Sequence, residues 1–230
     1  MRPEPTVVRT VREMQQLSDA WRNDGLRVGC GPTMGALHAG HLSLVRRAAR
    51  EADRVVVTLF VNPAQFGPQE DLRTYPENQE RDLALLEDMR VDLVFIPKPD
   101  DMYPAGFDTW VNVERIASRL EGESRPVYFR GVATVVTKLF NIVRPDRAYF
   151  GQKDAQQVRV IEKMVADLDL GLEVVAVPTV REPDGLAISS RNIHLSPDER
   201  KTATVLWSSL SAARDRWAQG EARASILKRV

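Results

Sequence analysis

The sequence predicts an α/β fold: a Rossmann-like parallel sheet with helices on both faces, followed by a smaller C-terminal domain. Short runs of β-branched residues alternate with longer segments of helical period, and one run, Arg54–Val61, is almost entirely apolar. Such a run is typical of a strand that is covered on both faces. Strand–helix–strand alternation favours parallel strands joined by right-handed crossovers. In sheets of this kind, ligands bind beyond the carboxyl ends of the strands.

The individual elements follow from the local pattern of apolar residues. Besides Arg54–Val61, short apolar runs predict strands at Leu26–Cys30, Val91–Ile96, Ala148–Phe150 and Glu173–Val177. Helical periodicity predicts helices at His41–Ala52, Pro76–Met89, Thr134–Val143 and Ala155–Asp167.

The pattern changes after Arg181, beyond which we expect no strong strand. We therefore place a domain boundary near residue 182, between a catalytic domain (1–182) and a C-terminal domain (183–230). Ser196-Pro197-Asp198-Glu199 is a typical helix start, with Ser as N-cap, Pro at the first helical position and Glu at the third. Apolar residues then recur at helical spacing up to a glycine that suits a helix end: Ala203, Leu206, Leu210, Ala213, Trp217 and Gly220. The final ten residues resemble the opening of a further helix, so we expect this domain to be truncated.

Composition limits the classes of function. Lys plus Arg and Asp plus Glu both number 32, so the formal net charge is zero, and a neutral chain gains little from attraction to a phosphate backbone. We therefore expect no nucleic-acid partner. The N-terminus has no signal-peptide pattern and the apolar runs are too short to span a bilayer, so we expect no membrane association. The single cysteine, Cys30, cannot form an internal disulfide, which favours a cytoplasmic location.

The first candidate site follows the first predicted strand. Gly31–His41 has the sequence GPTMGALHAGH and leads into a predicted helix. His38 and His41 are three residues apart, so they share a face of the first helical turn. Backbone N–H groups and the positive dipole end make this turn an anion site, and Gly35 and Gly40 allow close approach of a ligand. A capping loop with two solvated histidines is the alternative interpretation.

HAGH resembles the HxGH (HIGH) signature of the nucleotidyltransferase superfamily, and PTMGALHAGH is similar to the corresponding string of the pantothenate synthetase family. In that family this loop surrounds ATP. The resemblance implies that His41 and His38 are catalytic, with His41 as the proposed principal residue. The ATP-binding residues that it implies for this loop are Pro32, Thr33, Met34, Gly35, Ala36, Leu37, His38, Ala39, Gly40 and His41.

The second motif, NPAQFG at Asn62–Gly67, begins where the apolar strand ends. Amide side chains suit hydroxyl and carboxylate groups of a ligand, whereas a polar turn is the alternative for an isolated NPxQ. FVNPAQFG followed by DLRTYP resembles the second block of the same family. The resemblance implies that Gln65 holds pantoate and also contacts β-alanine. The further residues that it implies near these substrates are Asn62, Tyr75 and Asp82.

The third motif is the loop YFGQKDAQQ that leaves the strand Ala148–Phe150. Lys153 could neutralise phosphate charge there, and such a charge-assisted contact contributes roughly 1.5–3 kcal/mol; an ordinary solvated lysine is the alternative. Resemblance to the family implies that Lys153 contacts the ATP phosphates during catalysis and that Gln157 binds pantoate. The nucleotide-binding residues implied for this loop are Gly151, Gln152, Lys153 and Asp154.

Two positions depart from the family pattern. Many relatives carry Glu at the position of Gln152 and His at the position of Tyr128. The first change has no consequence if Gln152 faces solvent. The hydroxyl of Tyr128 can replace a hydrogen bond of the histidine but not its charge, so we leave Tyr128 out of the predicted site.

The fourth motif, PTVREPDGLAISSRN, follows the last predicted strand. Its two serine hydroxyls and one guanidinium could grip a phosphate; a surface loop with an exposed arginine is the alternative. The string resembles the family's counterpart of the mobile KMSKS-type loop, so we expect residues 183–230 to act as a lid. The ATP-binding residues that the resemblance implies here are Val180, Ile188, Ser189, Ser190 and Arg191. We expect His194 to be structural or to lie on the surface.

The resemblance covers nearly the whole chain through four blocks in the same order. It implies an ATP-dependent condensation of (R)-pantoate with β-alanine to pantothenate, through pantoyl adenylate, with release of pyrophosphate and AMP. ATP is then a substrate together with Mg²⁺, and we expect no metal site made of protein side chains. The resemblance also implies a homodimer. Two alternatives remain open at this point: another HxGH nucleotidyltransferase that adenylylates a phosphorylated acceptor, and a catalytically silent nucleotide-binding protein.

Overall fold

The computed structural model describes residues 4–68, 70–221 and 223, in two compact units that divide after Pro178. The first unit, Met1–Pro178, contains the sheet; the second, Thr179–Val230, is described by itself. The division lies close to residue 182, where the pattern of the sequence changes.

The first unit is built on a six-stranded sheet in which every pair of neighbouring strands is parallel. The strands are β1 (Thr6–Val8), β2 (Val28–Thr33), β3 (Arg54–Leu59), β4 (Leu93–Phe95), β5 (Arg147–Gly151) and β6 (Glu173–Val177). Their order is β1-β4-β3-β2-β5-β6. The chain runs outward from β2 through β3 to β4 and then returns to the other side of β2 as β5. The order of strands therefore reverses between β2 and β5, where sheets of this type bind their ligands.

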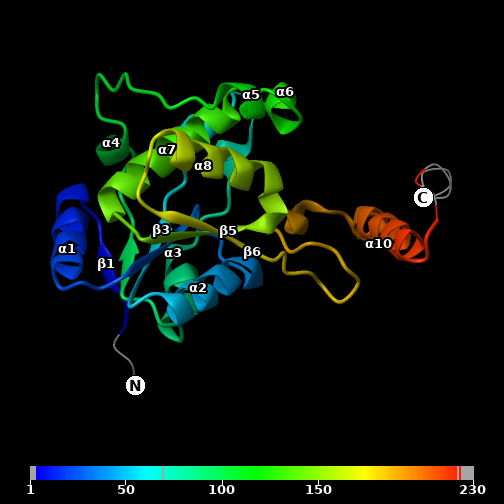
Figure 1. Cartoon of the computed structure of the whole chain (residues 1–230), viewed down its shortest axis with the longest axis horizontal. Coiled ribbons are helices and arrows are strands. Elements are labelled where there is room, and N and C mark those ends of the chain that lie inside the picture. The colour runs from blue at the N-terminus through cyan, green and yellow to red at the C-terminus, as the bar shows by residue number, and fades with distance from the viewer. Residues whose placement is uncertain (1–3, 69, 222, 224–230) are drawn as a thin grey trace. The chain divides into compact units, whose positions relative to one another are not determined.

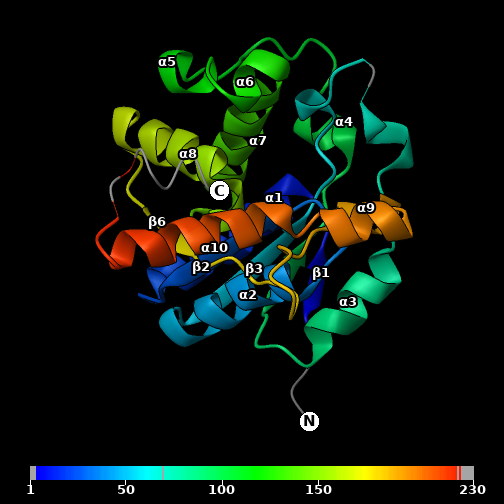
Figure 2. The same ribbon diagram turned by 90° about the vertical axis from the view of Figure 1, so that its right-hand side faces the viewer.

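Two hydrophobic cores cover the faces of this sheet. One face is packed by α1 (Val11–Asn23), α7 (Tyr128–Val143) and α8 (Ala155–Asp167), and the other by α2 (Ala39–Glu51) and α3 (Gln79–Glu87). Figures 1 and 2 show α7 and α8 on the face opposite to α2. The predicted fold class, a parallel sheet with helices on both faces, is confirmed. The predicted bounds of β6 and α8 are also confirmed.

Helix α7 begins at Tyr128, so the predicted start at Thr134 was wrong. Gly131 lies in the first turns, and glycine weakens a helical pattern in sequence. Packing against the short helix η1 (Pro63–Gln65) explains this glycine, because a Cβ at position 131 would lie 2.2 Å from the carbonyl oxygen of Ala64. Glycine at position 131 therefore allows the helix to approach the loop after β3 more closely than a residue with a side chain would.

Several elements of the first unit were not predicted. The three-residue strand β1 and the helix α1 are held by few apolar residues, of which Val8 and Met14 are fully buried. Short helices also follow β4, namely α4 (Pro99–Met102), α5 (Glu114–Ala117) and α6 (Glu121–Ser124). One cysteine, Cys30, is fully buried in β2, and this burial raises the pKa of its thiol to about 12.

The second unit contains an antiparallel bridge between Arg181 and Ala187, followed by η4 (Ser190–His194), α9 (Pro197–Thr202) and α10 (Val205–Ala218). The predicted helix start is confirmed, because Ser196 and Glu199 form a reciprocal capping box. The predicted continuous helix was wrong, since α9 and α10 are separate and Ala203 ends the first of them. The last residues, 224–230, lie outside the described part of the chain.

Candidate active site

Three of the four sequence motifs leave the carboxyl ends of neighbouring strands. The first follows β2, the second follows β3 and the third follows β5. Pro32 and Thr33 close β2, residues 34–37 form a loop, and His38 caps α2, whose first turn contains Ala39, Gly40 and His41. Gly151 ends β5, and Gln152, Lys153 and Asp154 form a single turn of 3-10 helix that is exposed. The first and third motifs therefore flank the point where the strand order reverses.

The loop after β2 is held by a carboxylate from α3. Asp82 is 2% exposed, and its two oxygens accept hydrogen bonds from the backbone N–H groups of Ala36 (2.8 Å) and Leu37 (2.7 Å). Ala36 has a φ of +49° and Gly35 a φ of +81°, so the carboxylate stabilises a turn in the left-handed region. The resemblance implies a place for Asp82 beside the substrate amides, whereas the structure bonds it to the backbone of the loop after β2.

His38 has a defined tautomer. Its Nδ1 accepts a hydrogen bond from the backbone N–H of Gly40 at 3.1 Å. Because a backbone N–H can only donate, the neutral imidazole must carry its proton on Nε2. A Cβ at position 40 would lie 2.8 Å from the His38 ring, which explains the glycine of the HAGH motif.

His41 lies against His38, with ring centroids 4.0 Å apart and an interplanar angle of 28°. Its Nδ1 is buried and has no hydrogen-bond partner among the described residues. Burial, followed by the proximity of His38 and Lys153, lowers the pKa of His41 to about 3. Burial and Lys153 also lower the pKa of His38. Both imidazoles are therefore neutral near pH 7, and Lys153 is close enough to act electrostatically on each of them.

Acidification is expected to destabilise the folded protein through His41. The unfolded chain has an imidazole pKa of 6.5 and the folded one a pKa of about 3, so the unfolded state binds more protons between these values. Stability from this group is complete above pH 6.5 and falls as the pH drops towards 3, by at most about 1.4 kcal/mol for each pH unit. Urea unfolding at pH 7 and pH 5 would measure the loss. His41→Gln should lose less stability over this interval, and an equal loss would contradict the assignment.

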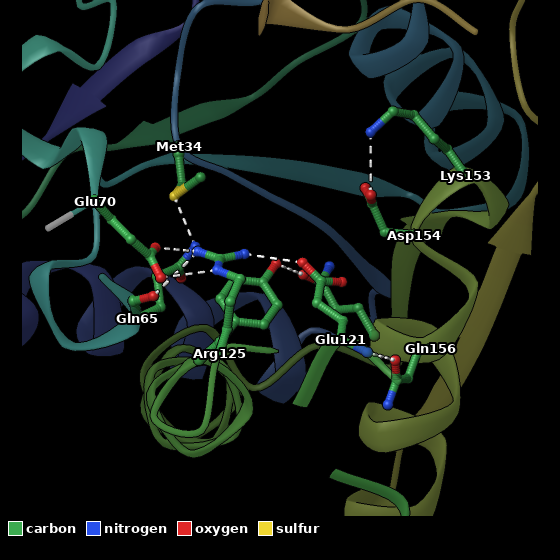
Figure 3. A network of polar contacts seen from close by, with 10 residues as sticks. Met34, Gln65, Glu70, Glu121, Arg125, Lys153, Asp154 and Gln156 are labelled. Atoms are coloured by element: carbon green, nitrogen blue, oxygen red, sulfur yellow. Dashed lines mark hydrogen bonds and ion pairs between the residues drawn. The ribbon is translucent and has the colours of Figure 1, made fainter. Parts of the chain in front are cut away.

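The second motif meets the first through Gln65. This side chain is 6% exposed, and its Nε2 donates to the Sδ of Met34 at 3.0 Å (Figure 3). Asn62, 1% exposed, donates from Nδ2 to the Oε1 of Gln65 at 3.1 Å. Tyr75 is buried and packs edge-on against Phe66 at 6.1 Å between ring centroids, as an aromatic residue that covers the core would.

The third motif meets the second through two residues that the sequence did not predict. The hydroxyl of Tyr128 donates to the Oε1 of Gln157 at 3.1 Å, and the guanidinium carbon of Arg125 lies 3.8 Å from the centre of the Tyr128 ring. Arg125 also donates to the backbone carbonyl of Gln65 at 3.5 Å and to Glu70 at 2.9 Å (Figure 3). These contacts join residues 29 and 60 positions apart in sequence, and no local motif indicates them.

A cavity of about 180 Å³ adjoins the loop after β2 on the side of β3, β4 and α3. Its lining includes Met34, Gly35, Phe60, Asn78, Asp82 and Pro97. Within the described ranges, no group of three or more His, Cys, Asp or Glu side chains could hold a metal ion. Among the helices that the structure describes, none is long and apolar enough to cross a membrane.

The fourth motif belongs to the second unit. The backbone N–H of Ile188 donates to the carbonyl of Val180 at 3.0 Å, which closes the hairpin. Ser189 caps η4 by accepting from the N–H of Arg191 at 3.3 Å. Ser190 is half-buried, whereas Arg191 and His194 are exposed. The loop therefore presents hydroxyl groups and a guanidinium from one ordered turn.

Comparisons with known proteins show which family the chain resembles. The family described as pantoate-beta-alanine ligase matches residues 6–230. Pantothenate synthetase of Roseiflexus castenholzii is 60% identical over 87% of this chain and 72% of that protein. A crystal structure of pantothenate synthetase from Thermus thermophilus has a TM-score of 0.91 and 51% identity, over 97% of this chain and 79% of that one.

A more distant structure carries ligands. It is a pantoate-beta-alanine ligase from Francisella tularensis complexed with beta-gamma ATP and beta-alanine. It has a TM-score of 0.83 and 37% identity, over 89% of this chain and 78% of that one. Both the sequence identities and the structural similarity extend over most of the chain. The chain therefore belongs to the pantoate–β-alanine ligase family.

Proposed function

We propose that this chain condenses pantoate with β-alanine in two steps that consume ATP. The observation that carries the proposal is that residues of three motifs lie close together. The histidine pair is neutral, and Lys153 is near enough to lower the pKa of both imidazoles. The buried amide of Gln65 contacts Met34, in the loop that leads to the two histidines. The ligand-bound relative from Francisella tularensis, complexed with beta-gamma ATP and beta-alanine, supports the choice of substrates.

ATP binds with its triphosphate at the N-terminus of α2. Displacement at phosphorus depends on positioning and charge stabilisation more than on a protein nucleophile. Lys153 supplies positive charge, while His38 and His41 supply N–H donors in a buried setting where such donors are effective. The negative charge of the phosphates also raises the pKa of both imidazoles, which opposes the effect of burial.

In the first step, a carboxylate oxygen of pantoate forms a bond to the α-phosphorus of ATP, and the bond from that phosphorus to pyrophosphate breaks. Gln65 and Gln157 hold the pantoate and then the adenylate. In the second step, the amine of β-alanine attacks the acyl carbon, loses a proton, and AMP departs. The intermediate is prone to hydrolysis, so exclusion of water by the buried Gln65 side of the site favours the amine.

Magnesium enters as part of the MgATP substrate. Mg²⁺ is commonly bound by substrate phosphates with one or two carboxylates rather than by a cage of protein ligands.

The second unit acts as a lid in this proposal. Ser189, Ser190 and Arg191 approach the triphosphate and complete the ATP site, because hydroxyls and a guanidinium match phosphate oxygens. We further propose that the protein works as a homodimer in the cytoplasm, where its lone buried thiol stays reduced.

Incubation with ATP, pantoate and β-alanine, followed by mass spectrometry, tests the function. We expect AMP and pantothenate to appear together, and pyrophosphate to exchange into ATP only when pantoate is present. Exchange without pantoate would indicate another nucleotidyltransferase. ATP binding with no AMP in the presence of both substrates would indicate a catalytically silent protein.

A further inference from the structure

The hydrogen-bonding capacity of Asn62 is fully used within the protein. Its Nδ2 donates to the carbonyl of Gly131 at 3.2 Å and to the Oε1 of Gln65 at 3.1 Å. Its Oδ1 accepts from the backbone N–H of Ala64 at 3.3 Å and from the hydroxyl of Tyr103 at 2.7 Å. An amide offers two N–H donors and two acceptor positions, so Asn62 has nothing left to offer a ligand.

Backbone groups decide which way the Asn62 amide points. The carbonyl of Gly131 can only accept and the N–H of Ala64 can only donate, so an Asn62 amide turned by 180° would lose both bonds. The usual ambiguity between oxygen and nitrogen in an amide is therefore removed at this residue. The close approach of Gly131 to Ala64 keeps both backbone groups in place.

The orientation of Asn62 in turn fixes Gln65. Because Nδ2 of Asn62 is a donor, the atom of Gln65 that faces it must be the acceptor Oε1. The amide nitrogen of Gln65 is then directed at the nucleotide loop, where it meets the Sδ of Met34 (Figure 3). A thioether is a weak acceptor. An oxygen atom of a carboxylate or hydroxyl would be a stronger partner for this N–H, since bonds to ionised acceptors are the stronger ones.

Tyr103 contacts the pair formed by Asn62 and Gln65 through Asn62. Its hydroxyl makes the shortest of the four bonds to Asn62, and its ring packs against Phe107 and Trp110 at 5.1 and 6.3 Å between centroids. Burial raises the pKa of the Tyr103 hydroxyl well above its ordinary value, so it remains a donor throughout the working pH range. The hydroxyl of Tyr103 bonds to Asn62, and Asn62 bonds to Gln65, so this hydroxyl acts on Gln65 through Asn62.

We propose that Tyr103 is a positioning residue: its bond to Asn62 reinforces the orientation that the backbone groups give this amide, and thereby holds Gln65 with an N–H, and not a carbonyl, directed at the oxygen atoms of pantoate. This inference rests on the proposed function, because it takes the substrate of that site to be pantoate. It assigns Asn62 to orientation of the binding amide, in place of the substrate contact suggested by the sequence.

Tyr103→Phe is the primary test, because it keeps the aromatic packing and removes one hydroxyl. We expect the KM for pantoate, and its Kd measured by calorimetry, to rise about threefold to tenfold, with the KM for ATP unchanged. Tyr149→Phe is the matched control: it removes another buried tyrosine hydroxyl, whose partner is Glu51 at the end of α2, and should leave both constants as in the wild type.

A double-mutant cycle distinguishes positioning from general support of the fold. In a Gln65→Glu background the donor is already lost, so Tyr103→Phe should weaken pantoate binding no further. Additive losses, an equal rise in the KM for ATP, or wild-type constants in Tyr103→Phe would each overturn the inference. A wild-type protein that binds pantoate without forming pantothenate would overturn the proposed function. The inference about Tyr103 would then be decided by the Kd for pantoate measured by calorimetry. If the wild-type protein binds no pantoate, both fail.

Discussion

Replacing His41 with alanine is expected to lower the turnover of pantothenate formation by a factor on the order of 10²–10³ while leaving the protein folded. The fold should survive because the buried Nδ1 of His41 has no partner in the described structure, so its removal leaves no other group unsatisfied. Turnover should fall because, in the proposed mechanism, the imidazole is a preorganised donor to the phosphates in a buried part of the site near Lys153. Single-turnover and steady-state rates, together with thermal unfolding, would measure both effects.

His194→Ala is the matched control for this experiment. It also removes one imidazole, but His194 is exposed in the second unit, so its turnover should equal that of the wild type. Near wild-type turnover in His41→Ala would remove His41 from the catalytic role, and unfolding of that variant would show that the ring supports the fold.

Asp82→Ala is expected to weaken ATP binding and to lower stability together. The carboxylate accepts from two backbone N–H groups of the loop that we propose binds ATP, and leaving a buried donor unsatisfied costs about 1–3 kcal/mol. The left-handed turn at Ala36 then loses its support. We expect the KM for ATP to rise by at least tenfold, because about 1.4 kcal/mol corresponds to a factor of ten. Steady-state kinetics at saturating pantoate and urea unfolding would measure the two effects.

Glu87→Gln serves as the control, because it neutralises an exposed carboxylate of the same helix. It should leave the KM for ATP and the free energy of unfolding close to their wild-type values. If Asp82→Ala lowered stability but left the KM for ATP unchanged, the carboxylate would support the fold without shaping the nucleotide site.

Features encoded by short-range pattern could be predicted from the sequence. The uninterrupted apolar runs and helical periods indicated the parallel sheet with its two helical layers, and β6 and α8 have the bounds that their sequences indicate. The histidine pair could be found because both rings lie within one helical turn. The break between α9 and α10 could not be predicted, since the apolar spacing continues through Ala203 without a glycine or proline.

Features that depend on contacts distant in sequence were missed. Asp82 lies 46 positions from Ala36, and Tyr103 lies 41 positions from Asn62. Each has an ordinary local context, so its partner is known only once the sheet has brought the segments together. Tyr128 was set aside because it cannot replace the charge of the family's histidine. The structure gives its hydroxyl the Oε1 of Gln157 as a partner.

The burial of Cys30 has a practical consequence for testing whether the second unit acts as the proposed lid. A thiol at the centre of β2, with a raised pKa, presents almost no thiolate to solvent. Maleimide dyes or nitroxide spin labels should therefore leave the native protein unmodified. Cysteines introduced at exposed sites such as Arg119 in the first unit and Gln219 in the second would then be labelled without background. Distances between two such labels, recorded before and after addition of ATP, would test the proposed role of the second unit as a lid.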